Sequence, residues 1–237
     1  MPKEYLIPSK ITQLEASTLT LRDRLLVRIL FRLGCRVSEA LAITTHDIDF
    51  INSRVSIIHL KARLNLNCRQ CGARLSLSHA YCPSCGIKTE TSTSSRLEKR
   101  KMRTLPIDTD TLRLIKEYID SGATVVKEGK TFIFGFGRHR AWQIIKESAI
   151  RGGLPELRNP ESGKIHNVSP HKLRDAFAVH AMKLDDSGEG MRFLQEHLGH
   201  TSFNTTAKYR KIASEEHRSW YEKLWLAQPE KNENSPR

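Results

Sequence analysis

Hydrophobic residues recur along most of this chain at the spacing of α-helices. In residues 21–33, leucines and isoleucines fall three or four positions apart after a capping residue, Thr18 or Thr20, and Gly34 ends the pattern. The same periodicity predicts further helices in a segment that begins at Pro8 and over 36–43, 108–119, 138–153, 169–184, 189–199, 202–212 and 214–227.

Two segments have the pattern of strands in a small antiparallel sheet. Residues 54–60 are rich in β-branched side chains, and 102–107 have the pattern of a returning partner. The long insertion between them contains four cysteines, and its segment at 91–95, TSTSS, is expected to be a flexible loop. A short extended stretch is predicted at 131–137. The fold is therefore predicted to be α+β and mainly α, without internal repeats.

The composition is that of a globular protein without a membrane segment. Hydrophobic residues make up 38% of the 237 positions, and no apolar run approaches the roughly 20 residues that span a bilayer. The first residues, MPKEYLIPSK, lack the apolar stretch of a signal peptide. We therefore expect a cytoplasmic protein with no membrane partner, and a disordered tail at 228–237.

The chain is strongly basic, with a formal net charge of +13 and an isoelectric point of about 9.7. Residues 61–103 hold ten lysines and arginines against two glutamates. A merely basic surface would explain this, but such a charge favours a polyanionic partner, and we expect nucleic acid.

Four of the five cysteines form two C-x2-C pairs, at 68–71 and 82–85, ten residues apart. This spacing predicts a structural Zn²⁺ held by Cys68, Cys71, Cys82 and Cys85, since four thiolates leave no open position for water. A redox pair is the alternative. The ribbon around the metal could contact DNA, contact a partner protein or brace a long hairpin, and Cys35 is expected to be simply buried.

Five further residues have chemistry suited to a phosphate. Arg36 follows Gly34 and Cys35 at a helix start, and His171 and Arg174 share one face at another helix start. His200 follows a helix stop, and Tyr209 lies nine residues later. Taken singly, each has an ordinary structural explanation, as a surface arginine, a capping or turn histidine, or a half-buried ring.

Together the segments GCRVSEAL, HKLR and LGHTSFNTTAKY resemble the boxes of the tyrosine recombinase (phage-type integrase) family, in the right order over residues 8–212. The nearest likeness is to the archaeal type, with a zinc ribbon inserted in the catalytic domain. The resemblance implies a recombinase-like catalytic domain over 1–227, with the ribbon at 62–98 inserted in its β-hairpin. It also implies an origin in a prokaryotic cell, its virus or a mobile element.

In members of this family a tyrosine attacks the DNA backbone and forms a 3′-phosphotyrosyl link, without ATP or a catalytic metal. By this resemblance Tyr209 is the nucleophile, Arg36 and Arg174 clamp the scissile phosphate, His200 donates a hydrogen bond to it, and His171 assists proton transfer. A lysine of the hairpin protonates the leaving 5′ oxygen, and Lys61 matches this position better than the alternative, Lys101.

Two departures from the family pattern are present. Asp175 follows Arg174 where family members often carry histidine, and the catalytic-type sequence begins within about ten residues of Met1. For the second departure we expect one of three explanations: the protein binds DNA as half of a clamp, with weak and salt-dependent affinity, a partner supplies a second DNA-binding domain, or the chain is a fragment. The family also implies a homo-oligomer on double-stranded DNA. An aromatic C-terminal face is expected to dock on a neighbouring copy or, equally, on its own domain; it comprises Trp220, Tyr221, Leu224 and Trp225.

The function predicted from these motifs is site-specific DNA recombination or integration. Its first rival is a type IB topoisomerase-like enzyme that only nicks and reseals DNA. The second is a non-catalytic zinc-ribbon DNA-binding protein, and the presence of all the matched site residues argues against it. An RNA-binding ribbon protein is a weaker third alternative, permitted by the ribbon alone.

Overall fold

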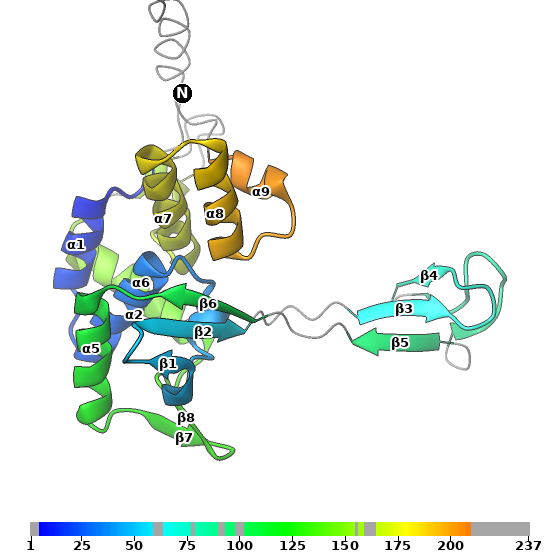
Figure 1. Ribbon diagram of the computed structural model, residues 1–237, viewed down its shortest axis with the longest axis horizontal. Coiled ribbons are helices and arrows are strands. Elements are labelled where there is room, and N and C mark those ends of the chain that lie inside the picture. The colour runs from blue at the N-terminus through cyan, green and yellow to red at the C-terminus, as the bar shows by residue number, and fades with distance from the viewer. Residues whose placement is uncertain are drawn as a thin grey trace, which may run out of the picture.

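The structure is a computed structural model that describes residues 5–58, 64–76, 79–89, 93–97, 102–154, 156–158 and 165–209. Helices dominate the larger part of the molecule, and strands β2 and β6 cross its middle (Figure 1). The helices are α1 (Pro8–Ala16), α2 (Leu21–Arg32), α3 (Val37–Ala40), α5 (Thr109–Asp120), α6 (Arg138–Arg151), α7 (Pro170–Leu184), α8 (Gly188–Leu198) and α9 (Phe203–Ala207). A 3-10 turn follows α3 at Thr45–Asp47.

Helix starts follow the predicted capping residues. The Thr20 hydroxyl accepts a hydrogen bond from the Asp23 amide at the start of α2, and Asp108 caps α5 in the same way. Ser169 precedes Pro170 at the start of α7 in extended conformation, without a side-chain cap bond. The helix expected over 36–43 is shorter, because it ends after one turn, at Ala40.

The central sheet has three antiparallel strands in the order β1-β2-β6. They are β1 (Ile48–Asp49), β2 (Arg54–Ile58) and β6 (Met102–Pro106), with Val55 opposite Leu105. This confirms the predicted pairing of the two strand-like segments. Two further strand pairs are short. One pairs β7 (Val125–Lys127) with β8 (Lys130–Phe132), which contains the first two residues of the predicted extended stretch, and the other pairs β9 (Leu157–Arg158) with β10 (Ile165–His166).

A second three-stranded sheet lies in the chain between β2 and β6, in the order β4-β3-β5. We call β3 (Leu64–Cys68), β4 (Arg74–Leu75), β5 (Thr93–Leu97) and the loops at 69–73 and 79–89 the ribbon, and the other described residues the body. The prediction of a flexible loop at 91–95 was wrong for 93–95, because Thr93 pairs with Cys68 and Ser95 with Leu66. Backbone pairing with β3 outweighs the weak strand propensity of a serine-rich segment.

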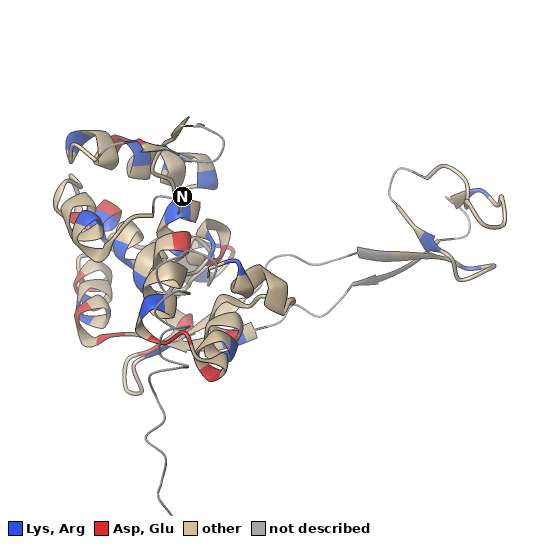
Figure 2. Cartoon of the chain, turned by 90° about the horizontal axis from the view of Figure 1, so that it is seen from above, with Lys and Arg blue, Asp and Glu red and all other residues tan. Residues whose placement is uncertain are grey.

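Charged side chains differ between the two parts. Basic and acidic residues alternate over the helices of the body (Figure 2). Side chains described in the ribbon include three basic ones, at Arg69, Arg74 and Lys88, all exposed, and no aspartate or glutamate.

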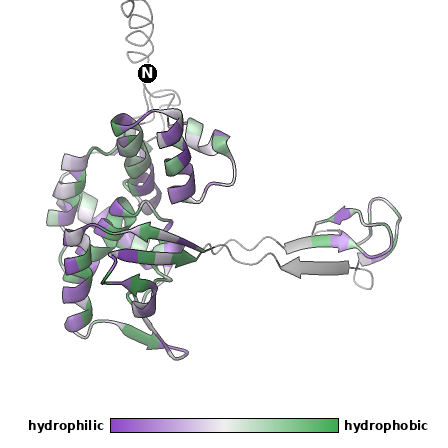
Figure 3. Cartoon of the chain, in the orientation of Figure 1, coloured by the Kyte–Doolittle hydropathy of each residue, from purple (hydrophilic) through white to green (hydrophobic). Residues whose placement is uncertain are grey.

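The core of the body forms around α2, which packs against α1, α5 and α7. Leu25, Leu26 and Leu30 of this helix are completely buried, and apolar positions also line the inner faces of its neighbours (Figure 3). A smaller cluster joins α7, α8 and the segment after α9, and it includes Leu198 and Tyr209. Among the described residues, no helix has the length and apolar character required to cross a membrane.

Candidate active site

Arg174 lies at the centre of the candidate site, on the first turns of α7. Its Nη1 donates to the carbonyl oxygen of Gly34 at 2.7 Å, and its Nη2 donates to that of Leu198 at 2.8 Å. The side chain is only 2% exposed, and burial together with nearby Arg36 lowers its pKa to about 10. Arg174 therefore stays charged at neutral pH and joins the end of α2 to the end of α8.

Gly34 shapes this junction. Its φ of +54° lies in the left-handed region, and an added Cβ would come within 2.4 Å of the Phe177 ring. Only glycine fits both constraints, which explains why the turn that presents its carbonyl to Arg174 has this residue. The glycine predicted as a helix stop is thus also part of the site.

His200 faces Arg174 from beyond the end of α8. Gly199 ends that helix in left-handed conformation, and His200 follows with its Nε2 3.0 Å from Arg174 Nη2 and its Nδ1 2.9 Å from Thr206 Oγ1. Since guanidinium can only donate, Nε2 accepts and Nδ1 carries the proton. Burial and Arg174 lower the pKa of His200 to about 4, so the ring is neutral at pH 7.

Arg36 reaches the same region through a buried carboxylate. Glu39 lies 2.9 Å from Arg36 Nη1 and 2.8 Å from Nη2 of Arg103, a residue of β6. Burial acts to raise the pKa of Glu39, but hydrogen bonds from Arg103 and from the Arg36 amide outweigh it and lower the pKa to about 2. Arg103 Nε also donates to the carbonyl oxygen of His197, so Arg103 and Arg174 together satisfy the last turn of α8.

Tyr209 contacts the site through Asp175. Its hydroxyl donates to Asp175 Oδ1 at 2.7 Å, and the tyrosine is 3% exposed. The other carboxylate oxygen, Oδ2, lies 3.9 Å from Nε2 of His171, one helical turn earlier on α7, whose side chain is 72% exposed. Burial and the bond to Asp175 raise the pKa of Tyr209, while Arg174 acts in the opposite direction.

The structure thus brings Arg36, His171, Arg174, His200 and Tyr209 together at the first turns of α7 and the end of α8. The two candidate general acids, Lys61 and Lys101, lie outside the described residues, as do the C-terminal aromatic residues. Cys35 is fully buried, as expected, and desolvation raises its pKa to about 12.

Sequence reasoning missed the residues that hold this arrangement together. Glu39 stands three positions after Arg36 inside the matched segment, and that spacing could have indicated an ion pair. Arg103 was visible only as one more basic residue. Asp175 stands out in the sequence as a departure from the family, but nothing there indicates its contact with Tyr209.

The four paired cysteines lie together at one end of the ribbon. The sulfur atoms of Cys68, Cys71, Cys82 and Cys85 are all within 4.8 Å of one another. The distances from Cys68 to Cys85 and from Cys71 to Cys82 are both 3.6 Å. A tetrahedral Zn²⁺ with bonds of about 2.3 Å separates its sulfur ligands by about 3.8 Å, so the cluster has the donor set and the size to hold a metal ion.

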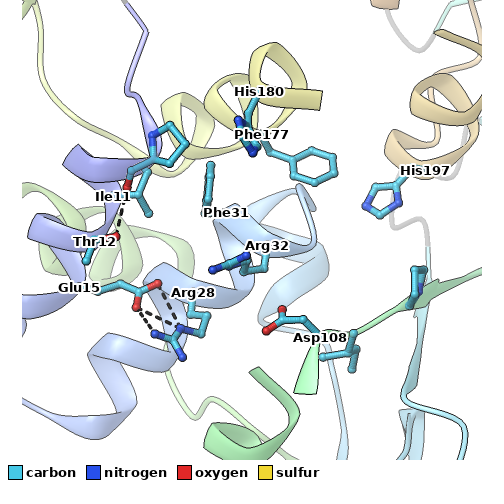
Figure 4. A pocket seen from close by; sticks show the side chains of 13 residues that line it. Ile11, Thr12, Glu15, Arg28, Phe31, Arg32, Asp108, Phe177, His180 and His197 are labelled. Atoms are coloured by element: carbon cyan, nitrogen blue, oxygen red, sulfur yellow. Dashed lines mark hydrogen bonds and ion pairs between the residues drawn. The ribbon is translucent and has the colours of Figure 1, made fainter. Parts of the chain in front are cut away.

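A cavity of about 520 Å³ lies beside this site, between α1, α2, β6, α7 and α8. Figure 4 shows Phe31, Phe177, His180 and His197 at one side of it and the Glu15–Arg28 ion pair at the other. His197 stacks on Phe177 with ring centroids 4.9 Å apart. The described residues that line this cavity do not include Arg36, Arg174 or Tyr209.

A model of the phage integrase family matches residues 6–216 of the chain. The chain belongs to the phage integrase family. Its curated relatives include the tyrosine recombinase XerC of Roseiflexus sp. strain RS-1, 27% identical over 202 residues that cover 81% of this chain and 48% of that protein. XerD of Corynebacterium glutamicum is 25% identical over 84% of this chain and 51% of that protein. The chain spans about half the length of these relatives.

Solved structures show the same fold. XerA recombinase superposes with a TM-score of 0.61 at 18% identity, covering 93% of this chain and 63% of that one. The integrase of transposon Tn1549, solved in complex with transposon right end DNA, has a TM-score of 0.61 at 14% identity, over 95% of this chain and 67% of that one. The catalytic domain of bacteriophage HP1 integrase has a TM-score of 0.51 at 19% identity, over 98% of this chain and 99% of that one. The predicted tyrosine recombinase catalytic-domain fold, mainly α with small antiparallel sheets, is confirmed.

Proposed function

We propose that this phage integrase family member cleaves and rejoins DNA strands through a covalent bond between Tyr209 and a 3′ phosphate. The proposal rests on one observation, that Tyr209 and Arg174 meet at α7. The hydroxyl of Tyr209 bonds Asp175, which directly follows the buried Arg174. A phenol and a fixed guanidinium side by side provide a nucleophile and a binding group for the charge that builds on phosphorus.

In this proposal Arg36 and Arg174 bind the non-bridging oxygens of the scissile phosphate. Arg174 is held in place by two backbone carbonyl groups, so little of its freedom is left to lose when a phosphate binds. Arg36 is more exposed, at 30% for its side chain, and its ion pair with Glu39 orients it. His200 Nε2 can donate to a phosphate oxygen only after it gives up the hydrogen bond that it accepts from Arg174 and carries a proton itself.

The leaving 5′ oxygen requires a proton from a general acid. We assign this role to Lys61, with Lys101 as the alternative. A DNA in which sulfur replaces the 5′ bridging oxygen needs no acid, so it should restore cleavage to the variant of the true lysine alone. If the substituted DNA restores neither Lys61→Ala nor Lys101→Ala, both assignments are wrong.

The test of the nucleophile is a trapping experiment. The substrate is a pool of nicked duplexes with randomised flanks. After cleavage a short fragment with a 5′ hydroxyl diffuses away, and its loss prevents rejoining. The unaltered protein should form an adduct that survives a denaturing gel, and the selected duplex then serves as the substrate for variants. Tyr209→Phe should give no adduct, while Tyr118→Phe, a body tyrosine whose hydroxyl bonds Ala123, should form it normally. Absence of an adduct with the unaltered protein would contradict the proposal.

We further propose double-stranded DNA as the substrate and a homo-oligomer on DNA as the active form. The positive charge of the chain and the likeness to a DNA-bound integrase support the first point. Plasmids with two selected sites separate recombination from the rival topoisomerase-like activity. Exchanged products indicate recombination, whereas relaxed plasmids alone indicate nicking and resealing. A partner that supplies a second DNA-binding domain would raise the affinity in the same assay.

We propose that residues 62–98 form a zinc ribbon inserted in the catalytic domain, with Zn²⁺ at the four cysteines. The sulfur separations near 3.6 Å support this metal. In each pair the amide of the second cysteine donates to the sulfur of the first and lowers the pKa of Cys68 and Cys82, which favours the thiolate that zinc requires.

A further inference from the structure

We infer that Asp175 is the group that accepts the proton of Tyr209 when the tyrosine attacks phosphorus. The inference depends on the proposed function, because it assigns a step within strand cleavage. Asp175 Oδ1 is 2.7 Å from the tyrosine oxygen and accepts its hydrogen, so donor and acceptor are already in the geometry of proton transfer. Asp175 thus touches the reacting atom itself.

The surroundings of the pair favour a side-chain base over water. Tyr209 is 3% and Asp175 is 8% exposed, and the tyrosine packs in an apolar cluster with Val179, Met191 and Leu198. Bulk water therefore has little access to the phenol. A carboxylate that already bonds the hydroxyl supplies the acceptor that this enclosed position otherwise lacks.

The resemblance assigns His171 to proton transfer from Tyr209. In the structure His171 lies beyond Asp175, on the side towards solvent. Its Nε2 lies 3.9 Å from the second oxygen of Asp175, and its ring is mostly exposed. This order, from tyrosine to aspartate to histidine to solvent, places Asp175 in contact with the phenol. His171 then acts on the carboxylate, as a neighbouring charge and as an exit for the proton towards solvent.

The step balances in atoms and charge. The oxygen of Tyr209 forms a bond to phosphorus, its proton passes to Asp175 Oδ1, and the bond from phosphorus to the 5′ oxygen breaks with its electron pair. The 5′ oxygen takes a proton from the general acid assigned above. In rejoining, the 5′ hydroxyl attacks phosphorus and returns its proton to the conjugate base of the general acid, while the departing phenolate recovers its proton from Asp175, by microscopic reversibility.

The charges around the phenol make this transfer necessary. An ionised Asp175 beside a phenolate would place two negative charges within 3 Å, and this repulsion adds to burial in raising the pKa of Tyr209. The positive charge of Arg174, on α7, acts to lower the pKa of Tyr209. Lys208 Nζ lies 4.6 Å from the centre of the Tyr209 ring, and Tyr5 faces Tyr209 from the segment before α1. Moving the proton onto Asp175 avoids the paired negative charges.

The decisive experiment compares Asp175→Asn with the unaltered protein on the selected nicked duplex. Asparagine keeps the size of the side chain but cannot accept a proton at neutral pH. We expect the rate of adduct formation at pH 7 to fall by about 10²-fold or more. The rate of the variant should then rise about tenfold per pH unit from 7 to 9, since hydroxide must remove the proton, while that of the unaltered protein should not.

Asp186→Asn is the matched control, because Asp186 is an exposed aspartate beyond the end of the same helix, and its adduct rate should be unchanged. Asp175→Ala provides a second measurement, the rescue of the adduct rate by a small carboxylate. No rescue is expected if Asp175 has a purely structural role. Added formate should fill the space left by the carboxylate and restore part of the rate, whereas chloride at the same concentration should not.

The inference is overturned if Asp175→Asn forms adduct as fast as the unaltered protein or faster, which would make the carboxylate a restraint on Tyr209. It is equally overturned if the variant is slow but keeps the unaltered pH profile, or if formate restores nothing to Asp175→Ala. These outcomes leave the proposed function standing, because the unaltered protein still forms an adduct that Tyr209→Phe does not.

Discussion

The body and the ribbon are stabilised in different ways. The body has an extensive apolar core, and its buried charges have partners: Glu39 accepts from Arg103, and Arg174 donates to backbone carbonyl groups. Among its described residues, no buried side-chain nitrogen or oxygen lacks a hydrogen-bond partner. The ribbon buries only Cys68, Leu75 and Cys82 among its described side chains, and two of these are candidate metal ligands.

This contrast indicates that the two parts have separate sources of folding energy. A cluster of three small or medium side chains cannot offset the conformational entropy of more than twenty ordered residues. Among the described residues, the side chains that hold the site at α7 all belong to the body. Removing the metal should therefore unfold the ribbon and leave the site in place.

The largest effect is expected from removing the zinc ion that we propose for the ribbon. Binding of structural zinc supplies about 10–16 kcal/mol of folding free energy in small zinc modules. With a chelator, or with Cys82→Ser, the peptides of 64–76 and 79–89 should lose protection from hydrogen exchange, and those of α2 should keep it. Ser84→Ala, between two ligands of the same knuckle, should retain one zinc per chain by elemental analysis. Loss of protection in α2 would show that the two parts are coupled.

Breaking the charge network of the body should have the next largest effect. Glu39→Gln leaves Arg36 and Arg103 beside a neutral side chain at a position that is 2% exposed. Removing one partner of a buried ion pair typically costs about 3–5 kcal/mol, so thermal unfolding of the body should shift clearly downward. Glu117→Gln, an exposed substitution on α5, should leave it unchanged, and the zinc content should stay the same in both. An unshifted melting temperature for Glu39→Gln would mean that the network contributes nothing to folding.

The same contrast explains what could be predicted from the sequence. Helices of the body follow apolar periodicity and capping residues, so α2, α5 and α7 were found, because local chemistry determines them. The strand β5 was missed because its pairing with β3 is a long-range property that a serine-rich segment does not display. The hairpins β7–β8 and β9–β10 are too short to show a period.

Within the site, motifs identified the phosphate-competent residues but not how they are held. Arg36, Arg174 and Tyr209 stand in recognisable boxes, whereas Arg103 approaches the end of α8 from 94 positions away in the chain. Nothing local to β6 indicates this contact. The bond between Tyr209 and Asp175 likewise joins residues 34 positions apart, and the packing of α8 against α7 and of α9 against α8 brings them together.

The smallest effect expected is a pH dependence that belongs to the body and not to the ribbon. The pKa of His200 is lowered from an ordinary value near 6.5 to about 4. Below pH 6.5 the unfolded chain takes up a proton that folded His200 does not bind. The stability that this residue contributes is therefore present above pH 6.5 and is lost as the pH falls towards 4. Glu39, with a pKa lowered to about 2, adds a second loss between about pH 4.5 and 2.

Thermal unfolding measured with a chelator present isolates the body, since metal thiolates also release their ion in acid. His200→Gln should flatten the dependence of the melting temperature between pH 6.5 and 4 and leave the lower window intact, whereas Glu39→Gln should flatten the lower window alone. His200→Gln should still show some decrease in melting temperature as the pH falls. We assign this remaining decrease to His197, because burial lowers its pKa as well. If His200→Gln keeps the full slope, the neutral ring that accepts from Arg174 is not the form that folding selects.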